Sequence, residues 1–267
     1  MLSEVIETIG RFFRQSTMSF KALFSWLNPK AYILIKVVNP MLQLIFFSLL
    51  ARYVYRVADI MPWVIGNAFV LCTYNAFFGI GMVLAEERNF GTLMIVIASP
   101  SNKFLVFLGR AFMHIIDGGI TVVIGLLTGA ALFGLSFIGV DLPLFVLTLV
   151  VAMFAVSALG LLISSFGLVM RDTNLVLNVL AMMLLALSGA NFPVAELPFI
   201  LQKVAYLMPL TRSIEAARLI MNGGGMNIVG NLIFSEFIVG VIYMLAGYLA
   251  LRVMEYYSIK NASLDII

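Results

Sequence analysis

Arg110, His114 and Asp117 are the residues of this chain whose types and spacing suggest proton chemistry inside an apolar helix. Their separations of four and three positions place them on one helix face. Histidine alone has an unperturbed pKa within physiological reach, so His114 could carry a proton. In the alternative, structural interpretation, a partner one or two helical turns away keeps Asp117 ionised, and His114 connects the polar residues of this helix face by hydrogen bonds. We favour this structural interpretation, because the group lies near one end of its helix and offers its own counter-charges.

The surrounding chain must place these groups in a lipid bilayer. Its 267 residues are 63% hydrophobic and 11% charged, with a mean hydropathy of +1.10, which excludes an ordinary soluble domain. The basic residues are scattered singly, so no nucleic-acid surface is expected. The single cysteine, Cys72, excludes a disulfide within the chain and a cysteine-based metal site. The composition predicts an all-α membrane protein with several spans.

Six apolar runs are predicted to be transmembrane helices. They cover about residues 30–51, 60–85, 104–137, 144–169, 174–190 and 228–251. Lys36 lies near enough to the inner end of the first span to snorkel, and Pro40 is expected to kink that span. Polar residues of the second span, such as Asn67 and Asn75, either line a path or bond to neighbouring helices, and we favour packing.

Residues 1–29 are predicted to form an amphipathic interfacial helix and an elbow, followed by a six-span transmembrane domain over residues 30–267. Charged residues interrupt any signal-peptide core, so the segment is not read as a signal peptide. At helical spacing the apolar side chains share one face. That face holds Leu2, Val5, Ile6, Ile9, Phe12 and Phe13.

The loop Glu86–Lys103 separates the second and third apolar runs. Its three adjacent charges, Glu86, Glu87 and Arg88, would each cost about 3 kcal/mol at a bilayer centre, so the chain has left the hydrocarbon here. The following apolar residues recur at helical spacing and predict a short amphipathic helix that Pro100 would stop. These residues are Phe90, Leu93, Met94 and Ile97.

Residues 191–227 are half-apolar but too rich in proline and glycine for a continuous span. We predict two short helices that re-enter the outer leaflet, over Leu197–Leu207 and Leu210–Met221. Four prolines and a glycine run punctuate the segment: Pro193, Pro198, Pro209 and Gly223-Gly224-Gly225.

Two motif blocks resemble those of type-2 ABC exporter permeases, the membrane subunits of ATP-driven exporters. The first reads Glu87-Arg88-x-x-Gly91-Thr92 and ends at Ser99-Pro100. The second block reads Gly189-x-x-Phe192-Pro193, Leu197-Pro198 and Pro209-Leu210-Thr211-x-x-x-Glu215-Ala216-x-Arg218. Their order and their distance from the spans agree with the family over essentially the whole chain.

The resemblance implies roles for three groups of residues. A loop that couples to the ATPase would comprise Glu86, Glu87, Arg88, Gly91, Thr92, Leu93, Arg171 and Asp172. A substrate path would be lined by Asn67, Tyr74, Asn75, Asn178 and Met182. An outer re-entrant segment would include Phe192, Pro193, Pro198, Pro209, Glu215 and Arg218.

The sequence contains no G-x-x-x-x-G-K-[ST] phosphate loop, so the ATPase is expected on a separate chain. We expect no cofactor and no metal on this chain, with ATP and magnesium held by the partner ATPase. Six spans are half of an exporter pathway, which predicts a homodimer or a pair with a paralogue, bound to two ATP-binding subunits. The other partner is the lipid bilayer.

The distribution of Lys and Arg favours cytoplasmic termini, with ten on the inner side of six spans and five on the outer side. The location implied is the cytoplasmic membrane of a bacterium or archaeon. The expected cargo is an amphipathic small molecule, a lipid or a lipid-linked glycan, moved outward. The main alternative is an ATP-independent secondary transporter or channel. A membrane-embedded enzyme is a less favoured hypothesis, because no second ionisable cluster accompanies Arg110, His114 and Asp117.

Overall fold

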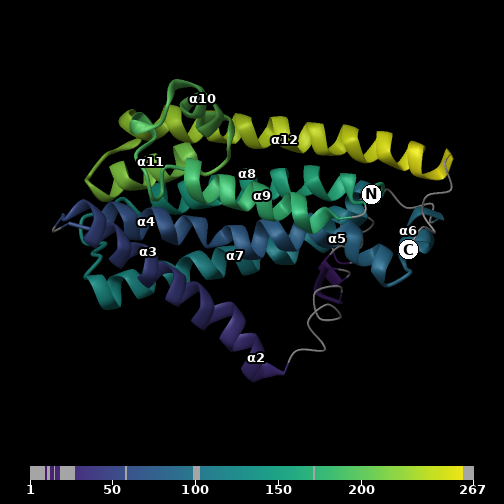
Figure 1. Ribbon diagram of the computed structural model, residues 1–267, viewed down its shortest axis with the longest axis horizontal. Helices are drawn as coiled ribbons and strands as arrows, with labels where there is room; N and C mark the ends of the chain where they lie inside the picture. Colours follow the sequence, from purple (N-terminus) through teal and green to yellow (C-terminus); the bar gives the residue numbers. More distant parts are fainter. Residues whose placement is uncertain are drawn as a thin grey trace.

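The computed structural model describes residues 10, 13–14, 16–18, 28–57, 59–98, 103–170 and 172–260, although the side chains of Tyr74 and Arg110 are outside that description. Within these residues the regular structure is helical and no strand occurs. Most helices run along the long axis of one bundle (Figure 1). The predicted interfacial helix of residues 1–29 lies largely outside the described residues.

Two of the long helices contain a π-helical turn. The first runs through α2 (Pro29–Ile33), η1 (Leu34–Val38) and α3 (Asn39–Tyr55), and the second through α4 (Met61–Val70), η2 (Thr73–Phe77) and α5 (Phe78–Asn89). The chain continues with α6 (Leu93–Ala98), α7 (Lys103–Phe133), α8 (Leu142–Phe166), α9 (Thr173–Leu187), η3 (Val194–Glu196), α10 (Phe199–Leu207), α11 (Thr211–Met221) and α12 (Met226–Lys260). The π-turns η1 and η2 were not predicted.

Five helices of the described chain are long and apolar enough to cross a membrane. They are Leu34–Tyr55, Met61–Asn89, Val106–Phe133, Leu142–Phe166 and Met226–Tyr257. The predicted fifth span corresponds to α9, which has only 15 residues. At 1.5 Å per residue such a helix is about 22 Å long, which is shorter than a typical hydrocarbon core of about 30 Å. The all-α membrane fold is therefore confirmed, whereas the number of spans stays a prediction.

Helix α8 lies at the centre of the bundle, where it contacts α5, α7, α9, α11 and α12. Its small residues let neighbouring backbones approach closely. A Cβ atom added at Gly160 would lie 3.0 Å from the carbonyl oxygen of Phe77, and the hydroxyl of Ser164 accepts a hydrogen bond from the Leu84 N–H. The second span is therefore fixed against the core by backbone contact.

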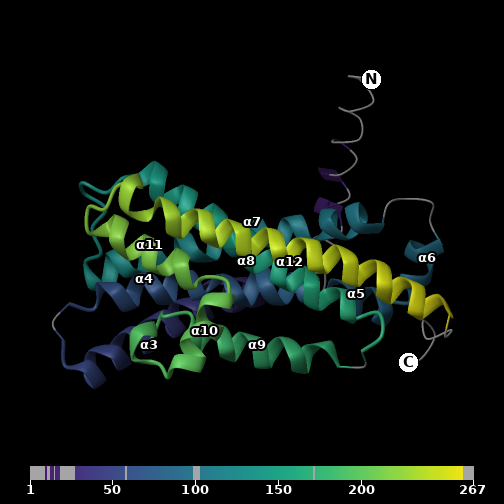
Figure 2. The same ribbon diagram turned by 90° about the horizontal axis from the view of Figure 1, so that it is seen from above.

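The bundle has two distinct ends. We call the end that carries α10 and α11 the cap end, and the end that carries α6 the loop end (Figure 1). At the cap end, α10 and α11 match the two short helices predicted from the prolines. Figure 2 shows α9 and α10 along one side of the bundle, with α12 crossing the others along most of its length.

Candidate functional site

The candidate site at the loop end begins where α5 continues past the apolar part of the second span. Helix α5 ends at Asn89, and Gly91 then adopts a φ of +69°, in the left-handed region that favours glycine. A Cβ atom added at Gly91 would meet no atom within 4 Å. The glycine is therefore required by the backbone turn and not by close packing within the chain.

Glu87 and Thr92 close this turn. The Thr92 N–H donates to the carbonyl oxygen of Glu87 at 3.0 Å, and its hydroxyl donates to Glu87 Oε2 at 2.5 Å. Leu93 follows at once and is buried against Val83, Leu84 and other apolar side chains. The turn therefore has a defined shape, and α6 is held against the bundle by its first residue.

The predicted face of the loop helix is only partly correct. It was expected to start at Phe90, but α5 extends to Asn89 and α6 starts at Leu93. Phe90 lies between the two helices with 66% of its surface exposed, whereas Leu93 is buried. Helical spacing across the turn therefore does not create one common face, because the left-handed residue Gly91 interrupts the helix. The side chain of Ile97 lies outside the described part.

Arg88 connects this loop to the turn after α8. Its guanidinium donates to the carbonyl oxygen of Met170 at 3.0 Å and also to that of Leu168. The sequence predicted that residues near both turns belong to one site, and Arg88 brings the two turns together. Arg171 lies outside the described residues. Asp172 caps α9, because its Oδ1 accepts a hydrogen bond from the Leu175 N–H at 3.0 Å.

Two of the proposed path residues, Asn67 and Asn75, are buried and hydrogen-bonded inside the bundle. Asn67 donates to the carbonyl oxygen of Trp63 at 2.9 Å and to Oδ1 of Asn191 at 3.0 Å. Asn75 accepts from Lys36 and donates to Thr121. These contacts agree with the packing interpretation of the polar residues in the second span.

Asn178 and Met182 instead lie on the exposed side of α9 and line cavities. Both border a small cavity against Val70 and Thr73 of the second span. Met182 also lines an apolar cavity of about 370 Å³ between α3 and α9, which reaches Phe192. The two cavities share Met182 and Leu185, so both lie against the same side of α9.

Arg218 fixes the cap end. From α11 it donates through Nε to the carbonyl oxygen of Pro62 at 2.8 Å and through Nη2 to that of Ala190 at 3.0 Å. Burial lowers the pKa of Arg218 to about 10, against the opposing effect of Glu215, so the side chain stays protonated at neutral pH. A Cβ atom at Gly66 would lie 2.8 Å from this guanidinium, which shows how closely it is enclosed.

The other predicted residues of this segment shape the cap end. Pro198 stands at the N-cap of α10, and Pro209 is buried in the turn between α10 and α11. Phe192 and Pro193 follow the end of α9 and are exposed. Glu215 is exposed on α11, one turn before Arg218.

Glu236 of α12 was missed by the sequence interpretation. It is fully buried, and its Oε1 accepts a hydrogen bond from the Leu210 N–H at 2.6 Å. Leu210 has a φ of +78°, which is unusual for a residue with a side chain, and it directly precedes α11. The sequence did carry a signal, since Glu236 is the one charged residue in the predicted span 228–251.

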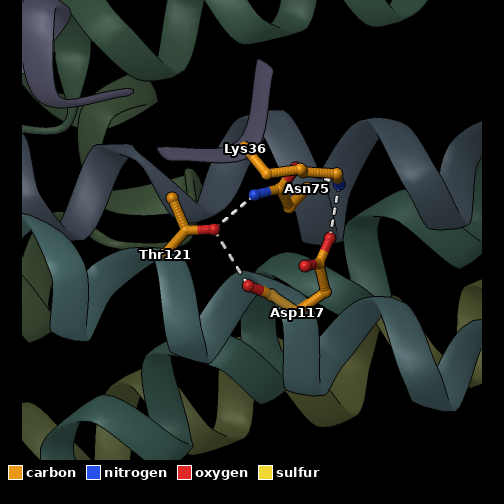
Figure 3. A network of polar contacts seen from close by, with 4 residues as sticks. All are labelled: Lys36, Asn75, Asp117 and Thr121. Atoms are coloured by element: carbon orange, nitrogen blue, oxygen red, sulfur yellow. Dashed lines mark hydrogen bonds and ion pairs between the residues drawn. The ribbon is translucent and has the colours of Figure 1, made fainter. Parts of the chain in front are cut away.

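Asp117 has a counter-charge on another helix. Lys36 in η1 forms an ion pair with Asp117, so it does not snorkel to the inner end as predicted (Figure 3). His114 is buried with its ring directly against Gly79. A paired Asp117 agrees with the structural interpretation of this group. The partner was expected on the same helix, and Asp117 was expected near the end of its helix, whereas it lies near the middle of α7.

Residues 16–222 match the family described as ABC-2 type transporter, so the chain belongs to this family. Together with the apolar helices, this makes it the membrane subunit of an ABC transporter, embedded in a membrane by several helices.

Two curated relatives from Escherichia coli strain K12 agree with that assignment. The chain is 29% identical over 149 residues to a protein named "Probable multidrug ABC transporter permease YbhR", a match that covers 55% of this chain and 40% of the relative. It is 25% identical over 154 residues to the "Inner membrane transport permease YhhJ", covering 56% of this chain and 40% of the relative. The chain thus spans about 40% of the length of each relative.

Proposed function

We propose that this chain is the permease of an exporter in which a separate ATPase drives the outward movement of an amphipathic small molecule, a lipid or a lipid-linked glycan. The observation that carries the proposal is the joined pair of turns at the loop end. Arg88 links the turn before α6 to the turn after α8, so a subunit bound there would push on the second, third and fourth spans together. This is the mechanical requirement for coupling ATP hydrolysis to movement of the helices.

The proposed docking surface consists of Glu86, Glu87, Arg88, Gly91, Thr92 and Leu93, and the proposal extends it to Arg171 and Asp172. Leu93 and Arg88 hold the loop on the bundle, while the neighbouring residues Phe90 and Ile95 leave apolar surface exposed for a partner. Asp172 contributes by fixing the start of α9. The proposed ATPase would carry ATP and magnesium.

The proposed route for the cargo follows α9. Asn178 and Met182 border the two cavities, and the larger cavity is almost entirely apolar, which suits the hydrophobic part of an amphipathic cargo. The word "multidrug" in the name of one relative favours a small molecule over a glycan. In this proposal the cap end closes the exit.

The proposed assembly has two permease chains, identical or paralogous, and two ATPase subunits. The exposed side of α9 then faces the second chain across the route, because a polar residue such as Asn178 is costly against lipid. We place the complex in the cytoplasmic membrane of a bacterium or archaeon, with the loop end and both termini on the cytoplasmic side.

A matched pair of substitutions at Gly91 tests the coupling role. Asn tolerates the left-handed region, whereas Val does not, so Gly91→Asn keeps the turn and Gly91→Val strains it by about 1–2 kcal/mol. In reconstituted vesicles, Gly91→Asn should retain ATP-driven transport. Gly91→Val should retain assembly and ATP hydrolysis but lose transport per ATP. Equal coupled transport by both variants would count against a docking loop here.

The alternative function, an ATP-independent secondary transporter or channel, makes an opposite prediction. Such a protein purifies without an ATPase and moves its cargo in ATP-free vesicles. Copurification of an ATPase, together with transport that stops when ATP is withdrawn, excludes the alternative.

A further inference from the structure

A polar network joins the first three long helices in the middle of the bundle (Figure 3). Lys36 of η1 forms an ion pair with Asp117 of α7 and donates to Oδ1 of Asn75 in η2. The Asn75 amide donates to the hydroxyl of Thr121, which in turn donates to the carbonyl oxygen of Asp117 at 2.9 Å. The side chains of Lys36 and Asp117 are only 11% and 9% exposed.

Both partners on the first two helices stand in π-turns. Lys36 lies within η1 and Asn75 within η2. A π-turn adds a residue to the helical ladder and changes the direction of the side chains around it, and such turns occur frequently at functional sites. The two turns therefore bring Lys36 and Asn75 to the same place on α7.

The first helix is attached more weakly at its start than further along. No residue of η1 is buried, whereas α3 buries Pro40, Leu44, Ser48 and Ala51. In Figure 1, α2 lies well away from the other helices, and α3 runs obliquely from it toward the cap end. Ile33 and Ile35 are exposed, whereas Lys36 points back toward the bundle. The start of the first helix is thus fixed to the bundle by the ion pair between Lys36 and Asp117.

The anchors of Lys36 lie on the two helices that flank the loop Glu86–Lys103. Asn75 stands midway along the span before the loop, and Asp117 stands near the middle of the span after it. A displacement of the loop moves both of these helices. Through Lys36, it also moves the first helix, which is not connected to the loop in sequence.

We propose that the Lys36–Asp117 ion pair is a strut that carries movement of the loop end to the first transmembrane helix. Lys36 and Asp117 are thus positioning residues, and the inference rests on the proposed ATP-driven function. The strut stays closed throughout the cycle, because separating two largely buried opposite charges costs free energy.

The test uses a neutral pair in the reconstituted complex with its ATPase. Single substitutions would leave one buried charge and disturb assembly, so the informative variant is Lys36→Met combined with Asp117→Asn, which removes both charges and keeps similar volumes. The matched control is Lys30→Met, which removes an exposed lysine from the same helix. Assembly, ATP hydrolysis and transport are measured for each.

For the neutral pair we expect normal assembly and ATP hydrolysis, with transport per ATP lower by about tenfold. The control should match the unsubstituted chain. A neutral pair with unchanged transport per ATP, or one whose loss of transport only follows loss of assembled complex, overturns the proposal.

A second variant replaces the ion pair by a covalent link. Lys36→Cys and Asp117→Cys, in a Cys72→Ala background, are joined by a short reducible bis-thiosulfonate cross-linker. We expect transport per ATP to be low before cross-linking, to recover after it and to fall again on reduction. Arrest of transport by the cross-link would show that the pair must separate, and it would overturn the strut.

Measurements on the unsubstituted complex and on the neutral pair distinguish an error in the strut proposal from an error in the proposed function. If the proposed function is wrong, the unsubstituted complex itself shows no ATP-dependent transport. If only the strut is wrong, the unsubstituted complex transports normally and the neutral pair does too.

Discussion

Each end of the bundle contains an arginine that donates to two backbone carbonyl groups, yet the two arginines connect different amounts of structure. At the loop end, Arg88 reaches two carbonyls of one turn, Leu168 and Met170. At the cap end, Arg218 reaches carbonyls at the start of α4 and beyond the end of α9, while Glu236 holds the start of α11 from α12. Buried charged side chains therefore tie the cap end to several helices, whereas at the loop end Arg88 reaches a single turn and the remaining attachment is the apolar packing of Leu93.

This difference indicates where stability and where movement are located. A segment held by buried charges from several helices opens only when the core around it opens. A segment held by one turn and by a small apolar cluster, separate from the main core, can respond to a partner without opening that core. Substitutions at the two ends can separate these properties.

The largest effect on stability is expected from Arg218→Ala. It leaves the carbonyl groups of Pro62 and Ala190 without their charged donor, and each such bond is worth about 1.5–3 kcal/mol, so the free energy of unfolding should fall by about 3–6 kcal/mol. Titration with a denaturing detergent in mixed micelles measures the change. Lys203→Ala is the control, since Lys203 is exposed and stacks on Phe199 at 4.4 Å. Equal losses of unfolding free energy for both variants would show that the hydrogen bonds of Arg218 do not stabilise the cap end.

An intermediate effect is expected from Glu236→Leu. It removes the acceptor of the buried Leu210 N–H, which should lower the free energy of unfolding by about 1–3 kcal/mol in the same titration. Glu236→Gln keeps an acceptor oxygen and should lose less. Should the two variants be equally unstable, the hydrogen bond to Leu210 is not what Glu236 contributes.

The smallest effect on stability is expected from Arg88→Ala. Its acceptors belong to one turn that lies partly at the surface, so the free energy of unfolding should fall by only about 1 kcal/mol. Transport per ATP should nevertheless fall by about tenfold, because the two turns no longer move together. Reconstituted complexes provide both measurements, with Arg252→Ala as a control on the exposed part of α12. If Arg88→Ala strongly lowered the free energy of unfolding but left transport per ATP unchanged, the loop end would be a site of stability and not of movement.

Local patterns in the sequence were sufficient for much of the fold. The prolines allowed the first and last residues of α10 and α11 to be predicted to within two residues, since proline restricts where a helix can continue. The loop was less well predicted, because the spacing of apolar residues gives no sign that a residue such as Gly91 adopts a left-handed conformation and interrupts the helix. The polar network was predicted only in outline, because Asn75 was expected to bond to a neighbouring helix and Asp117 to have a partner, but Lys36 was not identified as that partner. Lys36 and Asp117 are 81 residues apart, and a π-turn leaves no mark in the hydrophobic spacing.

For the candidate site, the sequence identified segments better than it identified roles. Asp172 was assigned to a docking surface but also caps α9, and Asn75 was assigned to a path but bonds to Lys36 and Thr121. Residue type and depth alone do not distinguish a polar group facing a path from one facing another helix. Glu236 could have been identified as the one charged residue of its span, but its partner could not, because a backbone N–H carries no side-chain signature.

The π-turn η1 also makes the first helix sensitive to residue count. Removing one residue from Leu34–Val38 would let the helix close in ordinary α register, and each residue of an α-helix advances it by about 100°. Everything before the deletion would then rotate by that amount relative to α3, carrying Lys36 away from Asp117 if the deletion falls after it. Relatives of this chain that keep the pair must therefore also keep the surplus residue, so a one-residue gap in this stretch would mark loss of the ion pair as clearly as a substitution of the lysine.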